Sequence, residues 1–395
     1  MRKAVIVSVA RSPIAKAIKG SLRYTKPEDY AAQVIRGMLA KIPQLDPADI
    51  DDVIVGNSLP EAEQGYNVAR SIALNAGLGH SVGGQTINRF CASGLQTIAA
   101  GANAIMANQM DVVLAGGVET MTFVPMGGNF FLPENGMMDS DPAAFTAMGH
   151  TAENVARKYG VTREEQDEFA MISHHKAEAA VKAGKFVDEI IPIQAVTPCV
   201  DENGNPGFTR KTFSMDEGFR PNMKIEALQK LRTVFDVEGS VTAGTSSQMS
   251  DGAAFVLLMS EEKAAEYGLK PIAEFVGYAA KGVDPALMGI GPMAAVPAVM
   301  KRTGLTVDDL SLIEINEAFA AQSIACIREL GLNKEIINVN GGACALGHPL
   351  GCTGSYLTCK LLMEMRRRKL NGKYGMVTMC VGGGQGSAGI FKFLE

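Results

Sequence analysis

The sequence lacks the features that mark membrane proteins and nucleic-acid-binding proteins. No stretch approaches the ~20 apolar residues that a membrane-spanning helix needs, so we expect no insertion into a membrane. Lysine and arginine number 37 against 42 aspartates and glutamates, which gives a formal net charge of -5. The chain therefore has no overall positive field to attract a nucleic-acid backbone or an anionic membrane surface. Any anionic ligand must be held by a local group of residues.

Signals for disulfides, for zinc and for secretion are missing as well. The seven cysteines form an odd number without a Cys-x-x-Cys pair, which argues against a disulfide framework and against a zinc ribbon. We expect no bound metal. Residues 1–15 contain no charged leader followed by a long apolar stretch and a small-residue cleavage site. These absences favour a protein of the reducing cytoplasm.

What is present is the composition of an ordinary globular protein. Hydrophobic residues make up 47% and charged residues 20% of the 395 positions, far from the composition of disordered chains. Because single hydrophobic cores stop growing at roughly 250–300 residues, the length predicts two or three structural units.

A weak internal repeat relates residues 1–120 to residues 271–395. In each part an apolar-periodic helix leads to an apolar strand, and a later strand ends in Asn before a Gly-rich turn that opens a helix. Such alternation is typical of layered α/β units, in which sites form where strand ends meet helix starts. Cys91 and His348 lie in the two corresponding turns, so we expect them to converge if the halves pack face to face. The predicted helices are 31–41 and 294–302, and the predicted strands are 3–9, 53–55, 86–88, 112–114, 312–315, 336–340 and 376–379.

Residues 120–250 differ in composition from both repeats. Prolines and glycines near the start of this region predict loops. One helix is predicted, because Thr162 and Glu165 have capping-box spacing before an amphipathic run that ends near Gly184. Farther on, a segment rich in basic and aromatic residues is typical either of a clasp for a phosphorylated nucleotide or of a solvated helix face and loop. Its members are Arg210, Lys211, Arg220, Lys224, Lys230 and Arg232 with Phe208, Phe213, Phe219 and Phe235.

Cys91 is a candidate nucleophile. It lies between a predicted strand and a helix rich in Ala and Gly. The dipole and free amides of a helix N-terminus make a thiol more acidic and favour the reactive thiolate. The alternative is a cysteine that serves as a small buried hydrophobic residue.

Two further reactive side chains lie among glycines. Glycines and a proline around His348 fix an unusual backbone path, which favours a functional imidazole over an ordinary loop histidine. By contrast, we expect His174 and His175 to be exposed on a helix and His80 to lie in a turn. Cys380 precedes a glycine run with dinucleotide-motif spacing, but too few residues follow for the helix and strand that this motif requires. The glycines instead allow backbone amides to approach a ligand, as an oxyanion hole needs.

Four segments resemble the signature blocks of the thiolase family and occur in the family's order. They are Asn88-Arg-Phe-Cys-Ala-Ser-Gly94, Asn316-Glu-Ala-Phe319, Gly341-Gly-Ala-Cys-Ala-Leu-Gly-His-Pro-Leu-Gly351 and Cys380-Val-Gly-Gly-Gly384. The resemblance extends over essentially the whole chain and includes Met148-Gly-His-Thr-Ala-Glu-Asn154 and Asp251-Gly-Ala-Ala254. It implies an α/β protein with the thiolase fold, in which two similar layered α/β/α halves form five layers (α-β-α-β-α) and carry an inserted loop domain.

The same resemblance implies domain boundaries and an assembly. The N-terminal half would comprise residues 1–119 plus 251–270, and the C-terminal half residues 271–395. Residues 120–250 would form the loop domain that binds coenzyme A (CoA). Members of the family lead us to expect a homodimer or a homotetramer.

The resemblance also implies a mechanism of acyl transfer between CoA thioesters. Cys91, activated by His348, would attack a 3-ketoacyl-CoA and form an acyl-enzyme, and Cys380 would act as acid and then as base. The amides of Cys91 and Gly382 would stabilise the tetrahedral intermediate, while His348 and a water held by Asn316 would stabilise the thioester enolate.

Substrate contacts follow from the resemblance too. Arg220 would meet the nucleotide end of CoA and Ser247 its pantetheine arm, while Met148 and Phe319 would line the acyl pocket. The expected partners are acyl-CoA and CoA. In this mechanism CoA is a substrate, and no cofactor is permanently bound.

Two departures from the pattern of biosynthetic thiolases favour the degradative branch. Thr245-Ser-Ser-Gln-Met-Ser-Asp251 stands where those members usually have Asn-Ala-Ser-Gly-x-Asn-Asp, and Ala147 stands where they usually have His. We therefore expect a 3-ketoacyl-CoA thiolase of fatty acid β-oxidation. The alternative is a biosynthetic acetyl-CoA C-acetyltransferase that condenses two acetyl-CoA. Cys380 argues against a ketoacyl-carrier-protein synthase, and the retention of all four blocks argues against a catalytically silent scaffold.

Overall fold

Strands from both ends of the chain form one large sheet in the computed structural model, which describes residues 2–395. Within these residues the sheet has ten strands, and β2 (Ala15–Lys16) is paired to β8 beside the main path. Parallel pairing of β3 with β5 and of β10 with β11 recurs at corresponding places, so the predicted repeat is present in the structure. The main order is β10 (Leu310–Ile315), β11 (Tyr374–Val381), β12 (Gln385–Phe393), β9 (Ala273–Gly282), β1 (Ala4–Arg11), β8 (Ser250–Ser260), β5 (Val112–Thr120), β3 (Asp52–Gly56) and β4 (Gln85–Ile87).

The two halves of this sheet are joined at β1 and β9. The register pairs Val5 with Glu274 and Ile6 with Ala273. On one side of this junction lie β8, β5, β3 and β4, and on the other lie β12, β11 and β10. Four strands of the N-terminal half (β1, β8, β5 and β3) recur in order as β9, β12, β11 and β10, whereas β4 has no counterpart strand, and hydrogen bonds at a short seam connect the two halves.

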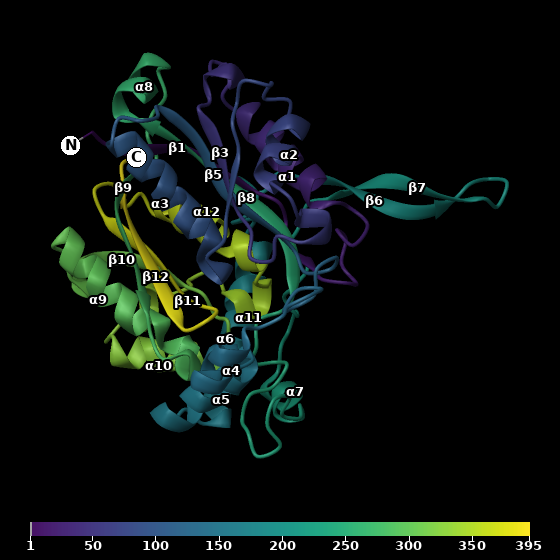
Figure 1. The fold of residues 1–395 in the computed structure, drawn as a ribbon, viewed down its shortest axis with the longest axis vertical. Coiled ribbons are helices and arrows are strands. Elements are labelled where there is room, and N and C mark those ends of the chain that lie inside the picture. The colour runs from purple at the N-terminus through teal and green to yellow at the C-terminus, as the bar shows by residue number, and fades with distance from the viewer. Residues whose placement is uncertain (1) are drawn as a thin grey trace.

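Helices and buried apolar clusters complete the five predicted layers. One cluster packs α1 (Pro27–Leu39) and α2 (Val68–Asn75) on the N-terminal sheet, and another packs α9 (Gly291–Thr303) and α10 (Ala320–Glu329) on the C-terminal sheet. The largest lies around α3 (Ser93–Met106) and α12 (Thr353–Arg367), which cross the middle of the molecule between the two halves of the sheet (Figure 1). α12 is buried from Thr353 to Met365, and the charged residues of this stretch have partners: Lys360 donates to Glu314 at 2.9 Å, and Glu364 accepts from Asn340 at 2.9 Å.

One predicted strand, 336–340, is wrong. Residues 334–336 form a 3-10 turn, and Ile337 makes a single parallel bridge to Ile313. Asn338 then leaves the extended conformation with φ 42°. Its side chain replaces the missing strand pairing, because Oδ1 accepts the Ile315 N–H at 2.9 Å and Nδ2 donates to the Ile315 carbonyl at 2.9 Å.

The region 120–250 holds more helix than the single one predicted. The predicted helix is α6 (Arg163–Lys182), and its capping box from Thr162 to Glu165 is confirmed. It is accompanied by α4 (Asn135–Ser140), α5 (Met148–Tyr159) and α7 (Ile225–Gln229). The sequence did carry a signal for the end of α5, because Gly160 adopts φ 61°, the left-handed conformation common after a helix.

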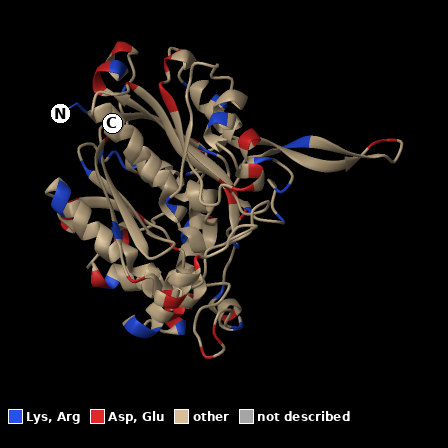
Figure 2. Ribbon diagram, in the orientation of Figure 1, with Lys and Arg blue, Asp and Glu red and all other residues tan. Residues whose placement is uncertain are grey.

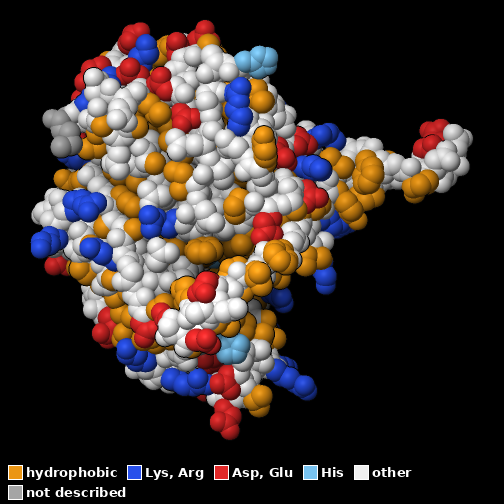
Figure 3. Space-filling model, in the orientation of Figure 1, with side chains coloured by type: hydrophobic (Ala, Val, Ile, Leu, Met, Phe, Trp, Pro, Cys, Tyr) orange, Lys and Arg blue, Asp and Glu red, His pale blue; other side chains and the backbone are white. Residues whose placement is uncertain are grey.

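A long β-hairpin separates the basic and aromatic residues that the sequence places in one segment. It consists of β6 (Ile193–Val200) and β7 (Pro206–Phe213) and stands away from the body as an arm bearing hydrophobic side chains (Figures 1 and 3). Arg210 lies on this arm and pairs with Asp29 at 2.8 Å, whereas α7 lies elsewhere on the molecule. The interpretation of the whole segment as one nucleotide clasp is therefore wrong, because β7 carries Phe208, Arg210 and Lys211 outward, whereas Phe213 at its base is buried in the core.

Charges of both signs are interspersed along the chain (Figure 2). Among the helices of residues 2–395, none combines the length and the apolar character needed to cross a bilayer.

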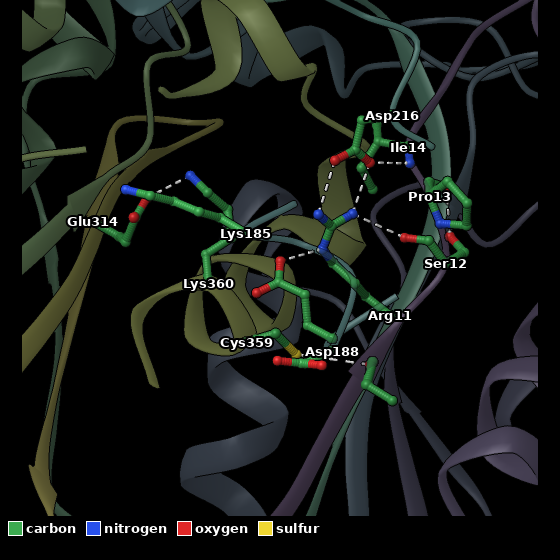
Figure 4. Close-up of polar contacts among 12 residues, drawn as sticks. Arg11, Ser12, Pro13, Ile14, Lys185, Asp188, Asp216, Glu314, Cys359 and Lys360 are labelled. Atoms are coloured by element: carbon green, nitrogen blue, oxygen red, sulfur yellow. Dashed lines mark hydrogen bonds and ion pairs between the residues drawn. The ribbon is translucent and has the colours of Figure 1, made fainter. Parts of the chain in front are cut away.

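A buried ionic cluster ties the inserted region to β1. The guanidinium of Arg11 donates to both carboxylate oxygens of Asp216, at 2.7 and 2.8 Å, and to Glu189 Oε1 at 2.7 Å. Figure 4 shows the Arg11 side chain directed at Asp216. All three side chains are at most 1% exposed. The guanidinium also donates to the Ser12 carbonyl at 3.1 Å, so its hydrogen bonds all go to buried acceptors.

Candidate active site

Cys91 lies at the entry to α3, as the sequence predicts. A 3-10 turn, Phe90–Ala92, precedes the helix, and Phe90 adopts φ 40°, an uncommon conformation for a bulky residue. Such backbone strain persists where surrounding structure over-determines it, often at functional sites. The turn places the Cys91 side chain in the interior, where it is 2% exposed.

The Cys91 thiol is less acidic than its position at a helix start suggests. Burial raises its pKa to about 11, although the backbone N–H groups of Gly382 and of Cys91 itself point at the sulfur and lower it. Loss of hydration thus outweighs the two amides, so the position at a helix start does not by itself make this thiol acidic. At neutral pH this cysteine is a thiol that needs a base.

Cys380, on β11, lies close enough to Cys91 for a charge on one sulfur to affect the pKa of the other. It is fully buried, and burial followed by the proximity of Cys91 raises its pKa well above the usual range. Its apolar surroundings include Phe319 and Met288, with Met148 and Phe235 packed against the same cluster. The side chains predicted to line an acyl pocket therefore lie beside Cys380.

The turn after β11 brings a backbone amide to Cys91. A Cβ on Gly382 would lie 3.2 Å from Cγ of Phe90, so the two turns are in close contact. Gly383 and Gly384 have φ 75° and 74°, which favour glycine. The glycine run is thus what allows the Gly382 N–H to reach the thiol.

His348 is held at both ring nitrogens and is 4% exposed. Nδ1 lies 2.6 Å from Thr353 Oγ1, whose hydroxyl donates to the Pro349 carbonyl at 2.9 Å. Thr353 must therefore accept the Nδ1 proton, which leaves Nε2 unprotonated. The amide Nδ2 of Asn316 lies 3.2 Å from that Nε2. Burial lowers the His348 pKa to about 3, so the ring is neutral at physiological pH.

The predicted catalytic residues come together in one place. Leu350, two residues after His348, belongs to the same small buried cluster as Cys91 and Met121. The 3-10 turn of Cys91 also contacts β11, which carries Cys380, and the turn Leu350–Cys352. The convergence expected from the repeat is therefore present, with Asn316 and Gly382 at the same centre.

The predicted substrate contacts are more dispersed. Ser247 is half-buried and its N–H donates to the Ala318 carbonyl at 2.9 Å, next to Phe319. Arg220 is exposed, and the ion pairs among residues 2–395 do not include it. Its guanidinium is thus available to a ligand at the rim of the inserted region.

His174 is not exposed, contrary to the prediction from its place in a helix. It is 3% exposed, and its Nδ1 accepts the backbone N–H of Arg220 at 3.1 Å. Burial, with a contribution from the nearby Arg220, lowers its pKa to about 4. Helical periodicity could not reveal this, because the covering loop comes from residues more than 40 positions away. His175 is exposed, as predicted.

Glu119 is a buried residue that the sequence reasoning missed. Its carboxylate accepts the N–H of Ser58 at 2.9 Å and the N–H of Gly351 at 2.7 Å. It thereby links a strand end of the first half to the histidine loop of the second. The signal in the sequence was an acidic residue inside an apolar strand, two residues after Gly117.

The layered halves and the cysteine–histidine–cysteine centre define the class of protein, and the comparisons agree. The chain belongs to the thiolase family: residues 4–262 match the model of the thiolase N-terminal domain and residues 269–393 that of the C-terminal domain. The resemblance seen in the sequence is thus confirmed.

The chain is similar over nearly its full length to individual thiolases. The chain is 50% identical over 99% of its length to the 3-ketoacyl-CoA thiolase of Bacillus subtilis, of which it covers 100%. It is 45% identical over 98% of its length to the peroxisomal 3-ketoacyl-CoA thiolase 2 of Arabidopsis thaliana, of which it covers 83%. Among solved structures, the acetyl-CoA acetyltransferase of Bacillus anthracis superposes with a TM-score of 0.89 at 40% identity, covering 100% of this chain and 99% of the other. Human mitochondrial 3-ketoacyl-CoA thiolase gives 0.88 at 37% identity with the same coverage.

Proposed function

We propose that the protein is a 3-ketoacyl-CoA thiolase of fatty acid β-oxidation, an acyltransferase that uses CoA to release acetyl-CoA and a shortened acyl-CoA. The observation that carries the proposal is the placement of the buried Cys91 thiol beside Cys380 and the Gly382 amide. The neutral His348 supplies the base that this thiol needs. The names of the full-length relatives support the same reaction.

The first step forms an acyl-enzyme. The Cys91 proton passes to Nε2 of His348 as the sulfur attacks the 3-keto carbonyl, and the bond between the α and β carbons then breaks. The N–H groups of Cys91 and Gly382 point at the sulfur and can stabilise the adjacent oxyanion, each by about 3 kcal/mol.

Asn316 suits both protonation states of His348. Its Nδ2–H donates to the unprotonated Nε2, while its buried Oδ1 has no hydrogen-bond partner among residues 2–395. Rotation of the amide would let Oδ1 accept from a protonated ring. The same oxygen can hold the water that stabilises the thioester enolate.

Cys380 handles the proton of the leaving enolate. Its raised pKa keeps the thiol protonated at neutral pH, so it can give its proton to the enolate carbon of acetyl-CoA. The resulting thiolate then takes the proton of the incoming CoA thiol, the CoA sulfur attacks the acyl-enzyme, and the released Cys91 sulfur takes its proton back from Nε2 of His348. The apolar cluster of Phe319 and Met148 beside Cys380 would hold the acyl chain, Ser247 the pantetheine and Arg220 the nucleotide.

The test is a series of 3-ketoacyl-CoA substrates of increasing length, assayed in the direction of cleavage. We expect higher kcat/KM for chains longer than four carbons than for acetoacetyl-CoA, and no cleavage by Cys91→Ala. The reverse ranking would favour a biosynthetic acetyl-CoA C-acetyltransferase, the second candidate, which the structural match to the Bacillus anthracis enzyme keeps open.

We further propose that the enzyme works in the cytoplasm as a homodimer or homotetramer without a resident cofactor or metal. Light scattering of the purified protein would give the number of subunits. Full activity after exhaustive dialysis against a chelator would support the absence of a resident cofactor or metal.

A further inference from the structure

One extended segment, Thr245–Ser250, runs past both loops that carry the proposed enolate site. At one end Ser246 forms an isolated antiparallel β-bridge with Phe319, and the Thr245 carbonyl accepts the Ala320 N–H at 2.8 Å. At the other end Met249 pairs with His348. The segment therefore connects the loop after Asn316 to the loop that holds the imidazole.

Gln248 makes the central contacts of this segment. Its backbone carbonyl accepts the His348 N–H at 3.0 Å. Its side-chain Nε2 lies 2.8 Å from the Gly218 carbonyl and 3.2 Å from each of the Cys344 and Ala345 carbonyls. Two N–H bonds are thus shared among three acceptors, two of which belong to the turn just before His348.

The third acceptor belongs to the segment that presents Arg220. This segment is fixed at alternate positions: Asp216 by Arg11, Gly218 by Gln248, and the Arg220 N–H by His174. A Cβ on Gly218 would lie 2.6 Å from the Ala345 carbonyl, so the backbones of the two segments touch. The Gln248 amide is therefore placed where the proposed CoA segment meets the histidine turn.

We infer that Gln248 is a positioning residue with two effects. It holds His348 next to Asn316, and it fixes residues 216–220, the segment that presents Arg220 to CoA in the proposed function, relative to the histidine turn. The inference deepens the proposed function and rests on it. Without the amide, the carbonyls of Gly218, Cys344 and Ala345 lose their shared donor and the histidine turn is free to shift. A displacement of about 1 Å in a catalytic group can cost roughly 100-fold in rate.

The experiment compares Gln248→Leu, which removes the donors, with Gln248→Glu, which keeps the shape but replaces them with acceptors. Gln33→Leu is the matched control, since Gln33 also makes side-chain hydrogen bonds but lies on α1. We expect both Gln248 variants to lose about ten- to 100-fold in kcat for thiolysis and to show a raised KM for CoA. The control should behave as wild type.

A second readout separates positioning from folding. Alkylation of Cys91 by iodoacetamide depends on the base near neutral pH but not once the thiol ionises by itself. We therefore expect the Gln248 variants to react more slowly than wild type at pH 7 and equally fast above about pH 11, with melting temperatures that stay well above the assay temperature. If Gln248→Leu does not fold, Gln248→Glu carries the same test.

Wild-type kcat and wild-type alkylation in a folded Gln248 variant would overturn the inference. So would a rate deficit that is equal at every pH and parallels a loss of stability, because that result indicates a purely structural role. Failure of the proposed function is distinguishable: wild-type protein would then lack thiolysis, while the alkylation comparison still reports on His348.

Discussion

Nε2 of His348 lies 3.2 Å from Nδ2 of Asn316, and the opposite ring nitrogen is held by Thr353 at 2.6 Å. Both partners are buried, and burial lowers the His348 pKa to about 3. The ring is therefore an unprotonated acceptor with a fixed tautomer across the physiological range. Because the Cys91 pKa is raised to about 11, neither group carries charge until a proton moves from one to the other.

His348→Asn should change how the reactivity of Cys91 depends on pH. In this variant we expect the alkylation rate to rise about tenfold per pH unit from pH 7 toward the thiol pKa, since only the thiolate reacts. In wild type the base should keep the rate higher near neutrality, and the two profiles should converge only near pH 11, where the thiol ionises without the base. Mass spectrometry of the Cys91 peptide measures this, with the less buried Cys199 as internal reference. Superimposable profiles would show that His348 is not the base.

Cys380→Ala should block turnover without removing the nucleophile. We expect kcat for thiolysis to fall about 100- to 10,000-fold, the usual range for loss of a general acid–base group, with little change in KM. Steady-state kinetics measure the loss, and alkylation of Cys91 in the same variant is the control. A variant that keeps more than a tenth of wild-type kcat would assign the proton transfer to another group.

His174→Gln should reduce the sensitivity of the fold to acid. The unfolded chain takes up a proton at His174 near pH 6.5, whereas the folded protein does so near pH 4. Between these values the unfolded state binds more protons, so stability falls as the pH falls, by about 1.4 kcal/mol per pH unit for this group. Urea unfolding midpoints at pH 6.5 and 4.5 should therefore differ less in the variant than in wild type. Equal differences would contradict the buried, neutral state of His174.

Arg11→Met should destabilise the protein strongly. The substitution leaves the carboxylates of Asp216 and Glu189 buried without their partner, and we expect a loss of about 3–5 kcal/mol. Arg210→Met is the matched control, because its ion pair with Asp29 is partly exposed and should contribute less than about 1 kcal/mol. Denaturant unfolding of both variants decides the matter. Equal stabilities would mean that the cluster does not anchor the inserted region.

Local patterns in the sequence predicted the parts of the structure that depend on residues close together in the chain. The capping box at Thr162 set the start of α6, and the glycines after Cys380 indicated where an amide could approach a ligand. The repeat of strands and helices placed Cys91 and His348 at equivalent turns. Each of these signals resides within a few residues of the feature it predicts.

Tertiary structure determined the properties that depend on burial and on contacts between distant segments of the chain. Helix position suggested an acidic Cys91 and an exposed His174, yet packing raised the pKa of the first and buried the second. The contacts of Gln248 with Gly218 and with the histidine turn join segments from three parts of the chain. The sequence by itself determined which chemical groups the protein has. Their protonation states and mutual positions follow from the exclusion of water by residues that are remote in the chain, which no local pattern records.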